Sequence, residues 1–130
     1  MKNYRDVVAA DPGNPQALNN LAYLTSEYAH QPNEAMQYAQ KAKELAPNDP
    51  AYSDTLGWIL YRKGLYPSAV TELERAVAKQ GDPVWKYHLA MAYAKAGDVT
   101  RGRSTLRAGL KQNPNLPEAK AAQEILGEAK

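Results

Sequence analysis

The chain has 130 residues, and neither cysteine nor phenylalanine occurs in it. The absence of cysteine excludes disulfides, zinc sites built on thiolates and thiol nucleophiles, and it leaves the redox compartment undetermined. Long apolar runs are also absent, because every uncharged apolar run is far shorter than the roughly 20 residues needed to cross a bilayer. The opening stretch, "MKNYRDVVAADP", is too polar and too short for a secretion leader. We therefore expect no membrane span, and the compartment stays unknown.

The net charge of +2 conceals an uneven distribution along the chain. Residues 1–59 carry four basic and seven acidic side chains, whereas residues 60–111 carry ten basic and four acidic ones. A moderately basic half by itself is a weak sign of nucleic-acid binding.

Proline is spaced almost regularly. The phrases "DPGNP", "APNDP", "GDP" and "NPNLP" end at 15, 50, 83 and 117, which are 35, 33 and 34 residues apart. The segments between them are rich in strong helix formers, and proline is tolerated in the first turn of a helix. No alternating strand pattern is present. The sequence predicts an all-α chain with helices at 3–10, 15–29, 32–46, 51–63, 67–79, 83–96, 99–112 and 117–128.

The predicted helices form pairs with an internal repeat. Gly64 and Gly97 stand in equivalent turns, where glycine supplies the left-handed conformation that ends a helix; the first pair has one extra residue and no glycine there. In the first helices, Leu21, Leu56 and Leu89 each precede a small residue. In the second helices, small residues and leucines recur on one face, and they allow two helix axes to approach closely. These positions are Ala35, Ala39, Ala42, Ala69, Leu73, Ala76, Gly102, Leu106 and Gly109.

With these motifs the chain resembles the tetratricopeptide repeat family, whose unit of about 34 residues follows W-x₂-L-G-x₂-Y, then A-x₃-F, A and P. The stretch "SDTLGWILYRKG" is similar to bacterial members. The resemblance implies a right-handed superhelix of stacked helical hairpins. The expected division is a partial repeat at 1–14, repeats at 15–49, 50–82 and 83–116, and a capping helix at 117–130, as in a piece of a longer array.

The resemblance implies a protein-binding scaffold, because the first helix of each pair lines a concave groove in this family. Trp58 is expected to be exposed in that groove, Tyr61 and Tyr87 fit the groove or the core, and Tyr93 is assigned to packing. A peptide or an amphipathic helix is the expected ligand. The groove residues are expected to be Asn19, Tyr23, Glu27, Asp54, Trp58, Tyr61, Arg62, Tyr87, Met91 and Lys95.

Two more specific functions fit the sequence poorly. A variant of the family grips the terminal carboxylate of chaperone tails with Lys and Asn, but Asn19 is followed by Tyr23, Asp54 and Tyr87 at the groove positions. Catalysis has little support, since His30 and His88 have no spaced metal-ligand partner and no glycine-rich phosphate loop occurs. A triad of Ser53, Asp54 and His88 can be imagined, but their spacing does not require one. We expect neither an enzyme nor a cofactor.

Two alternatives to peptide binding remain open. Arg101, Arg103, Arg107 and Lys111 make one helix basic enough to attract a polyanion, although a solvated outer face is the preferred interpretation. Self-association is the other, because Tyr4, Val7 and Val8 of the half repeat would otherwise leave an apolar side uncovered.

Overall fold

The computed structural model describes residue 6 and residues 8–127, and within them all regular structure is helical. Among the described residues no helix is both long enough and apolar enough to span a membrane. Half of the expected helix at 3–10 lies outside the described residues, and its described residues, 6 and 8–10, are helical. The helices are α2 (Pro15–Glu27), α3 (Pro32–Leu45), α4 (Pro50–Arg62), α5 (Tyr66–Lys79), α6 (Pro83–Lys95), α7 (Val99–Gln112) and α8 (Ala119–Leu126).

Three of these helices start with proline directly after a polar capping residue. The side chains of Asn14 and Asp49 accept hydrogen bonds from the N–H groups of Ala17 and Ala51, at 3.1 and 3.0 Å. Asp82 accepts one from the N–H group of Val84 at 2.8 Å. Each cap satisfies an N–H that the helix itself leaves without a partner, and the proline that follows needs none. The pairs Asn14–Pro15, Asp49–Pro50 and Asp82–Pro83 therefore mark the starts of α2, α4 and α6.

The turns inside the pairs confirm the role predicted for glycine. Gly64 and Gly97 have φ angles of 82° and 96° at the ends of α4 and α6. In the turn between α2 and α3, which has no glycine, His30 adopts the left-handed conformation with φ 54°. This region is strained for most side chains, so the first hairpin is closed at a cost that the other two avoid.

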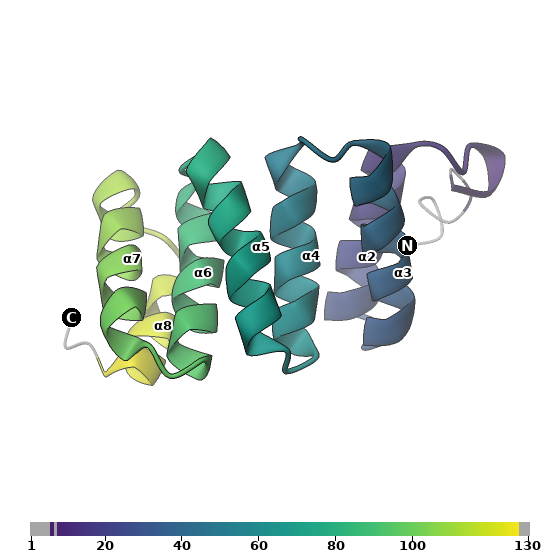
Figure 1. Ribbon diagram of the computed structural model, residues 1–130. Coiled ribbons are helices and arrows are strands. Elements are labelled where there is room, and N and C mark those ends of the chain that lie inside the picture. Colours follow the sequence, from purple (N-terminus) through teal and green to yellow (C-terminus); the bar gives the residue numbers. More distant parts are fainter. Residues whose placement is uncertain (1–5, 7, 128–130) are drawn as a thin grey trace.

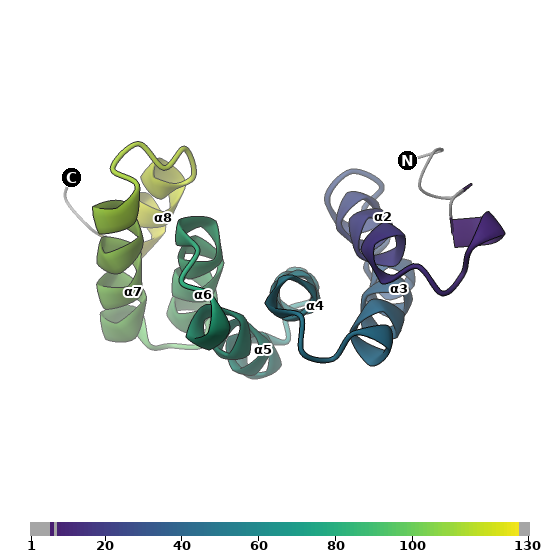
Figure 2. The same cartoon turned by 90° about the horizontal axis from the view of Figure 1, so that it is seen from above.

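The helices form a curved solenoid. Consecutive helices pair as α2 with α3, α4 with α5 and α6 with α7, and each pair stacks on the next (Figure 1). Seen from above, the pairs follow an arc in which α2, α4 and α6 face the hollow side and α3, α5 and α7 lie outside (Figure 2). Helix α8 contacts both α6 and α7. The three inner helices, which are far apart in the sequence, thereby share one concave surface.

Small residues set the spacing of the stack, as the sequence predicts. The predicted small and leucine positions of α3, α5 and α7 are all buried. A Cβ atom on Gly57 would lie 2.6 Å from Cγ of Leu73, and one on Gly102 would lie 3.0 Å from the carbonyl oxygen of Ala90. Because real Cβ atoms essentially never come within 3.0 Å of a neighbour, glycine is required where α4 meets α5. Where α7 meets α6, a Cβ atom would be tight against the backbone, and the two helices would have to move apart slightly to admit it.

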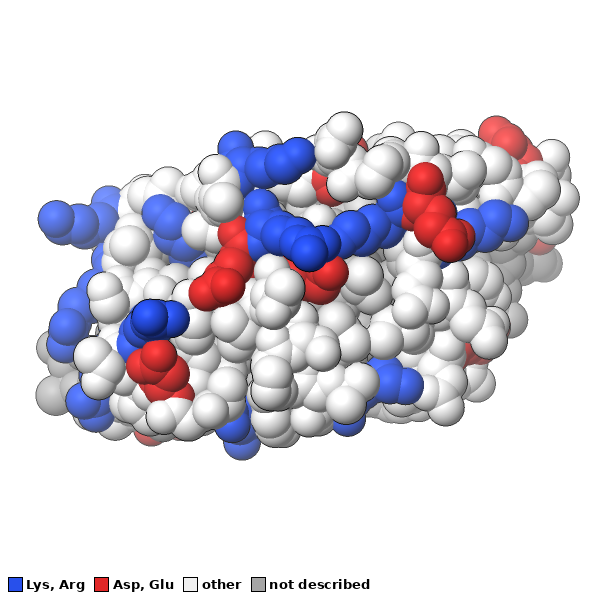
Figure 3. Space-filling view, in the orientation of Figure 1, with Lys and Arg blue, Asp and Glu red and all other residues white. Residues whose placement is uncertain are grey.

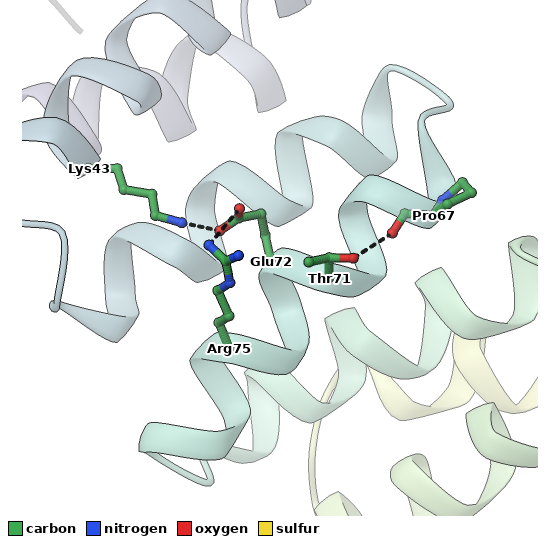
Figure 4. A network of polar contacts seen from close by, with 5 residues as sticks. All are labelled: Lys43, Pro67, Thr71, Glu72 and Arg75. Carbon is green, nitrogen blue, oxygen red and sulfur yellow. Dashed lines mark hydrogen bonds and ion pairs between the residues drawn. The ribbon is translucent and has the colours of Figure 1, made fainter.

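One ion pair on the outer surface joins two neighbouring hairpins. Figure 3 shows this surface, with basic side chains spread over it and acidic ones between them near its middle. Glu72 of α5 binds both Lys43 of α3 and Arg75 of its own helix (Figure 4). The basic surface is therefore partly neutralised by acidic groups of the same chain.

Candidate functional site

The concave surface of α2, α4 and α6 is the candidate site, and the residues expected to line it divide by exposure. Tyr23, Arg62 and Lys95 are exposed. Asn19, Glu27, Tyr61 and Tyr87 are half-buried. Asp54, Trp58 and Met91 are buried. The first two groups therefore offer a partner most of the contact area.

Trp58 is a core residue, so the expected exposure of its indole in the groove is wrong. It is 3% exposed. Its ring stacks on Tyr61 with centroids 4.5 Å apart and on His88 with centroids 4.1 Å apart. It shares an apolar cluster with Met91 and Leu126, to which α8 also contributes. The indole therefore packs beneath the groove surface, against the side chains of Tyr61 and His88.

Asp54 and His88 form a buried pair between α4 and α6. The His88 Nδ1 and the Asp54 Oδ1 lie 2.8 Å apart. A neutral imidazole with its proton on Nδ1 donates this hydrogen bond to the carboxylate, which leaves Nε2 as an acceptor. The sequence contained a signal for this contact, because the two residues are 34 positions apart and so occupy neighbouring copies of the repeat. One carboxylate oxygen of Asp54 is thus held by His88 within the chain.

Arg62 links the first two inner helices across the groove. Its Nη2 and Nε donate to the two carboxylate oxygens of Glu27 at 2.8 and 3.0 Å, and its Cζ lies 4.9 Å from the ring centroid of Trp58. The hydrogen bond to Glu27 raises the pKa of Arg62 above its ordinary value. Two predicted groove residues therefore form a bidentate ion pair, which fixes the guanidinium over the indole.

Three tyrosines, one from each inner helix, surround this ion pair. Burial raises the pKa of Tyr23, Tyr61 and Tyr87 above the ordinary value for tyrosine. The negative charge of Glu27 adds to the increase for Tyr23 and Tyr87. All three side chains therefore present neutral hydroxyl groups that can donate and accept hydrogen bonds, beside aromatic rings that can pack against a ligand.

A hollow of about 450 Å³ opens between the inner helices where α4 and α6 begin. Of the predicted groove residues, Asn19, Tyr23 and Asp54 line it. Trp85 also lines the hollow and was not among the groove residues predicted from the sequence. Trp85 lies three residues before His88, and this spacing places both residues on one face of α6. The hollow is lined by Asn19, Asn20, Tyr23, Leu24, Ala51, Asp54, Thr55, Val84, Trp85 and His88, and we call it the α4/α6 hollow.

A sequence profile described as tetratricopeptide repeat matches residues 55–117 and 87–129, which together cover more than half of the chain. The chain belongs to the tetratricopeptide repeat family. This scaffold generally mediates protein–protein interactions and is generally non-enzymatic.

Curated relatives of this tetratricopeptide repeat chain come from pseudomonads. It is 38% identical over 88 residues to the TPR repeat-containing protein PA4667 of Pseudomonas aeruginosa, covering 68% of the chain and 15% of that protein. It is 29% identical over 133 residues to cellulose synthase operon protein C of Pseudomonas fluorescens, covering 95% of the chain and 10% of that protein. The chain thus spans a small fraction of the length of either relative.

Solved structures share the fold. TTC0263, a thermophilic TPR protein of Thermus thermophilus, has a TM-score of 0.79 at 18% identity, covering 96% of this chain and 70% of that one. The O-GlcNAc transferase of Thermobaculum terrenum has a TM-score of 0.80 at 24% identity over 86% of this chain and 22% of that one. The type III secretion translocator chaperone SycD of Yersinia enterocolitica has a TM-score of 0.74 at 19% identity, covering 87% of this chain and 89% of that one. At these identities the likeness shows the tetratricopeptide fold alone.

The basic helix of this tetratricopeptide repeat chain uses part of its charge internally. Arg101 pairs with Asp98, with 3.4 Å between Nε and Oδ2, and Arg103 donates from Nε to the carbonyl oxygen of Leu126 at 2.8 Å. The second bond satisfies a carbonyl at the end of α8, which the helix leaves without a partner. Arg103 therefore serves the junction between α7 and α8, which limits how much of this helix is available to a polyanion.

The apolar residues before Pro12 are only partly visible. Tyr4 and Val7, on which the expectation of self-association rested, lie outside the described residues. Val8 is half-buried and packs against a cluster of Leu18, Ala42 and Tyr52. At least this one residue of the expected apolar side is covered by the chain itself.

Proposed function

We propose that the chain is a protein-interaction module that binds a peptide or a helix of a partner protein on its concave surface. The observation that carries the proposal is the meeting of Tyr23, Tyr61 and Tyr87 from three separate helices around the Arg62–Glu27 ion pair. Tyr and Arg are enriched where proteins bind one another, because they combine a large contact area with polar groups.

The proposed contact surface is narrower than the set of residues that the repeat pattern suggests. Tyr23, at 39% exposure, and Arg62 are available to a ligand directly. The half-buried rings of Tyr61 and Tyr87 offer an edge or a face. The buried residues of the groove act by fixing the positions of these groups. Lys95 is exposed near the end of α6 and would contact only a ligand that runs along the full length of that helix.

The concave shape suits an extended peptide or one helix of a partner. The inner surface is formed by three helices side by side, and the α4/α6 hollow gives it one deeper point. An ordered ligand such as a preformed helix would bind more tightly than a flexible peptide, because ordering a peptide offsets part of the interaction free energy.

We propose no catalytic role for the chain. Asp54 orients the imidazole of His88 as it would in a catalytic dyad, but no described serine or threonine hydroxyl donates a hydrogen bond to that imidazole. A nucleophile within hydrogen-bond reach of its base is what such a mechanism requires. The pair is better explained as a link between hairpins and as part of a ligand surface.

The test begins with a partner that co-purifies with the chain and is identified by mass spectrometry. Binding of the purified partner is then measured for Tyr23→Ala combined with Tyr87→Ala, and for a control, Lys41→Ala combined with Thr71→Ala, which changes exposed positions on the outer helices. The groove variant is expected to bind at least about tenfold more weakly and the control equally well. Full affinity in the groove variant, with an unchanged helical circular dichroism spectrum, would refute the proposal.

A further inference from the structure

We infer that the α4/α6 hollow is a subsite for a cationic side chain of the partner, with arginine as the preferred residue. The inference rests on the proposed function, since it concerns how the same concave surface selects its ligand. None of the ten described residues that line the hollow is Lys or Arg, while the carboxylate of Asp54 is in its wall. Most of the lining residues come from the acidic half of the sequence.

One carboxylate, that of Asp54, lies in the wall of the hollow, and those of Asp49 and Asp82 lie at the starts of the two helices beside it. With His88 neutral and its single proton on Nδ1, the Asp54–His88 pair has a net charge of −1. Asp49 and Asp82 cap α4 and α6, whose first turns supply Ala51 and Val84 to the wall. Their negative charges also offset the partial positive charge of those helix starts, which would otherwise favour an anion. A cation is therefore the charge that this end of the groove favours.

Two hydrogen-bond acceptors around the hollow have no partner within the described chain. His88 is 5% exposed, and its only hydrogen bond runs from Nδ1 to Asp54, so Nε2 is left without one. The side-chain oxygen of Asn19 is buried without a hydrogen-bond partner. Because Nε2 of His88 is not among the side-chain atoms that are both buried and unpaired, it keeps some accessible surface for a ligand. The Asn19 oxygen has almost none, so a ligand reaches it only after the side chain turns, and that hydrogen bond would pair a buried polar atom that is otherwise unpaired.

Arginine fits this set of groups better than other side chains. The guanidinium group carries five N–H donors and no acceptor, which matches an imidazole nitrogen, an amide oxygen and a carboxylate. Tyr23 and Trp85 place two aromatic rings in the wall, and a guanidinium group stacks on such rings more readily than an ammonium group does. A carboxylate or phosphate of a ligand would instead meet Asp54 without a compensating cation.

The chain does not supply this cation itself. Arg62 lies on the same helix as Asp54, eight residues further on, and its guanidinium is held by both carboxylate oxygens of Glu27. It is also fixed above the ring of Trp58. The basic group of the groove is thereby kept away from the hollow, and the acceptors there stay available.

The inference is tested by NMR titration of the full chain with N-acetyl-arginine methylamide, read from the indole N–H signal of Trp85 and the side-chain amide signals of Asn19. The matched probe is N-acetyl-citrulline methylamide, which has nearly the same shape without the charge. The arginine probe is expected to shift these signals in a saturable way, and the citrulline probe to bind at least about tenfold more weakly.

A charge-only variant sharpens the test. Asp54→Asn keeps an oxygen that accepts from His88 Nδ1 and removes the negative charge, so the arginine probe should bind at least about tenfold more weakly. Glu44→Gln neutralises an exposed carboxylate on the outer helix α3 and should leave binding unchanged. If Asp54→Asn does not fold, the variant Asp49→Asn combined with Asp82→Asn replaces it, because asparagine keeps both helix caps. The affinity for the arginine probe should then fall about threefold.

Several results would overturn the inference. They are the absence of any saturable shift with the arginine probe, equal binding of the citrulline probe, tighter binding of N-acetyl-lysine methylamide, and binding that does not change in the charge variants. The partner used to test the concave surface separates the two proposals. If that partner binds wild type and Asp54→Asn with equal affinity, the subsite is refuted and binding on the concave surface is not. If it binds the Tyr23 and Tyr87 variant with full affinity, binding on the concave surface is refuted as well.

Discussion

The Nδ1 atom of His88 lies 2.8 Å from a carboxylate oxygen of Asp54, and both side chains are buried although one repeat of sequence separates them. This contact joins the inner helices of two successive hairpins. Trp58, on the same helix as Asp54, stacks on the imidazole ring and completes the junction. The floor of the groove is therefore a combined polar and aromatic contact between repeats, and its residues matter for folding as well as for binding.

The two tryptophans should respond differently to truncation. Trp58→Ala is expected to lower the free energy of unfolding by about 3–5 kcal/mol, because it empties a buried site between α4 and α6. Trp85→Ala removes a half-buried ring and should cost only about 1–2 kcal/mol. Urea unfolding followed by circular dichroism measures both values. Equal costs for the two variants, or a stable Trp58→Ala protein, would show that Trp58 is not a core residue.

Gly57→Ala should destabilise the chain through a clash. The added Cβ would lie 2.6 Å from Cγ of Leu73 and 3.2 Å from its backbone nitrogen, so the free energy of unfolding should fall by about 1–3 kcal/mol. Combining it with Leu73→Ala relieves the clash, and the double variant should be more stable than the sum of the two single changes predicts. Gly13→Ala, at an exposed turn where the added Cβ would lie 3.8 Å from Oδ1 of Asp11, is the control and should be close to neutral. Additive effects of Gly57→Ala and Leu73→Ala would contradict the close approach.

The Arg62–Glu27 ion pair should contribute a small coupling that depends on salt. A double-mutant cycle with Arg62→Ala and Glu27→Ala is expected to give about 0.5–1 kcal/mol, because the arginine side chain is partly exposed to solvent. The coupling should shrink in about 1 M NaCl, where the Debye length falls to roughly 3 Å. Arg62→Lys keeps the charge but loses the bidentate geometry, and it should retain less than the full coupling. A coupling of zero at low salt would show that the Arg62–Glu27 ion pair does not stabilise the groove.

Tyr93 should make stability fall in alkaline solution. Burial, together with the hydrogen bond to the carboxylate of Glu74, raises the pKa of Tyr93 to about 12. Since the unfolded chain has the ordinary value near 10, the contribution of Tyr93 is complete below pH 10 and is lost as the pH rises towards 12. Tyr93→Phe should cost less than about 1.5 kcal/mol at pH 8 and should weaken the alkaline loss of stability. An identical pH dependence in wild type and Tyr93→Phe would refute this.

The fold was predictable because its signals are local. Three Asn-Pro or Asp-Pro pairs start α2, α4 and α6 through a cap within three residues, and Gly64 and Gly97 end a helix through their own backbone conformation. Small residues at spacings of three and four define the buried face of each outer helix. Each of these signals acts within a few residues and repeats with the period of the hairpin, so three copies support one another.

The candidate site was less predictable because burial there is decided by distant segments. Trp58 follows Gly57 at the edge of the helix face, and its exposure depends on α6 and on the apolar cluster that α8 completes. Asp54 has the composition of a groove residue, yet a histidine in the next repeat takes its carboxylate. Trp85 lines the hollow from the first turn of α6, and none of the leucine or small-residue repeat positions identified from the sequence falls in that turn.

Photo-crosslinking from paired positions on the two surfaces tests the central claim most directly. A benzophenone amino acid replaces Tyr23 on the concave surface in one protein and Lys41 on the outer surface in another, and each is irradiated with the purified partner. The account predicts a covalent adduct from position 23 and none from position 41. An adduct from position 41 alone would place the binding surface on the outer helices and contradict the proposed function.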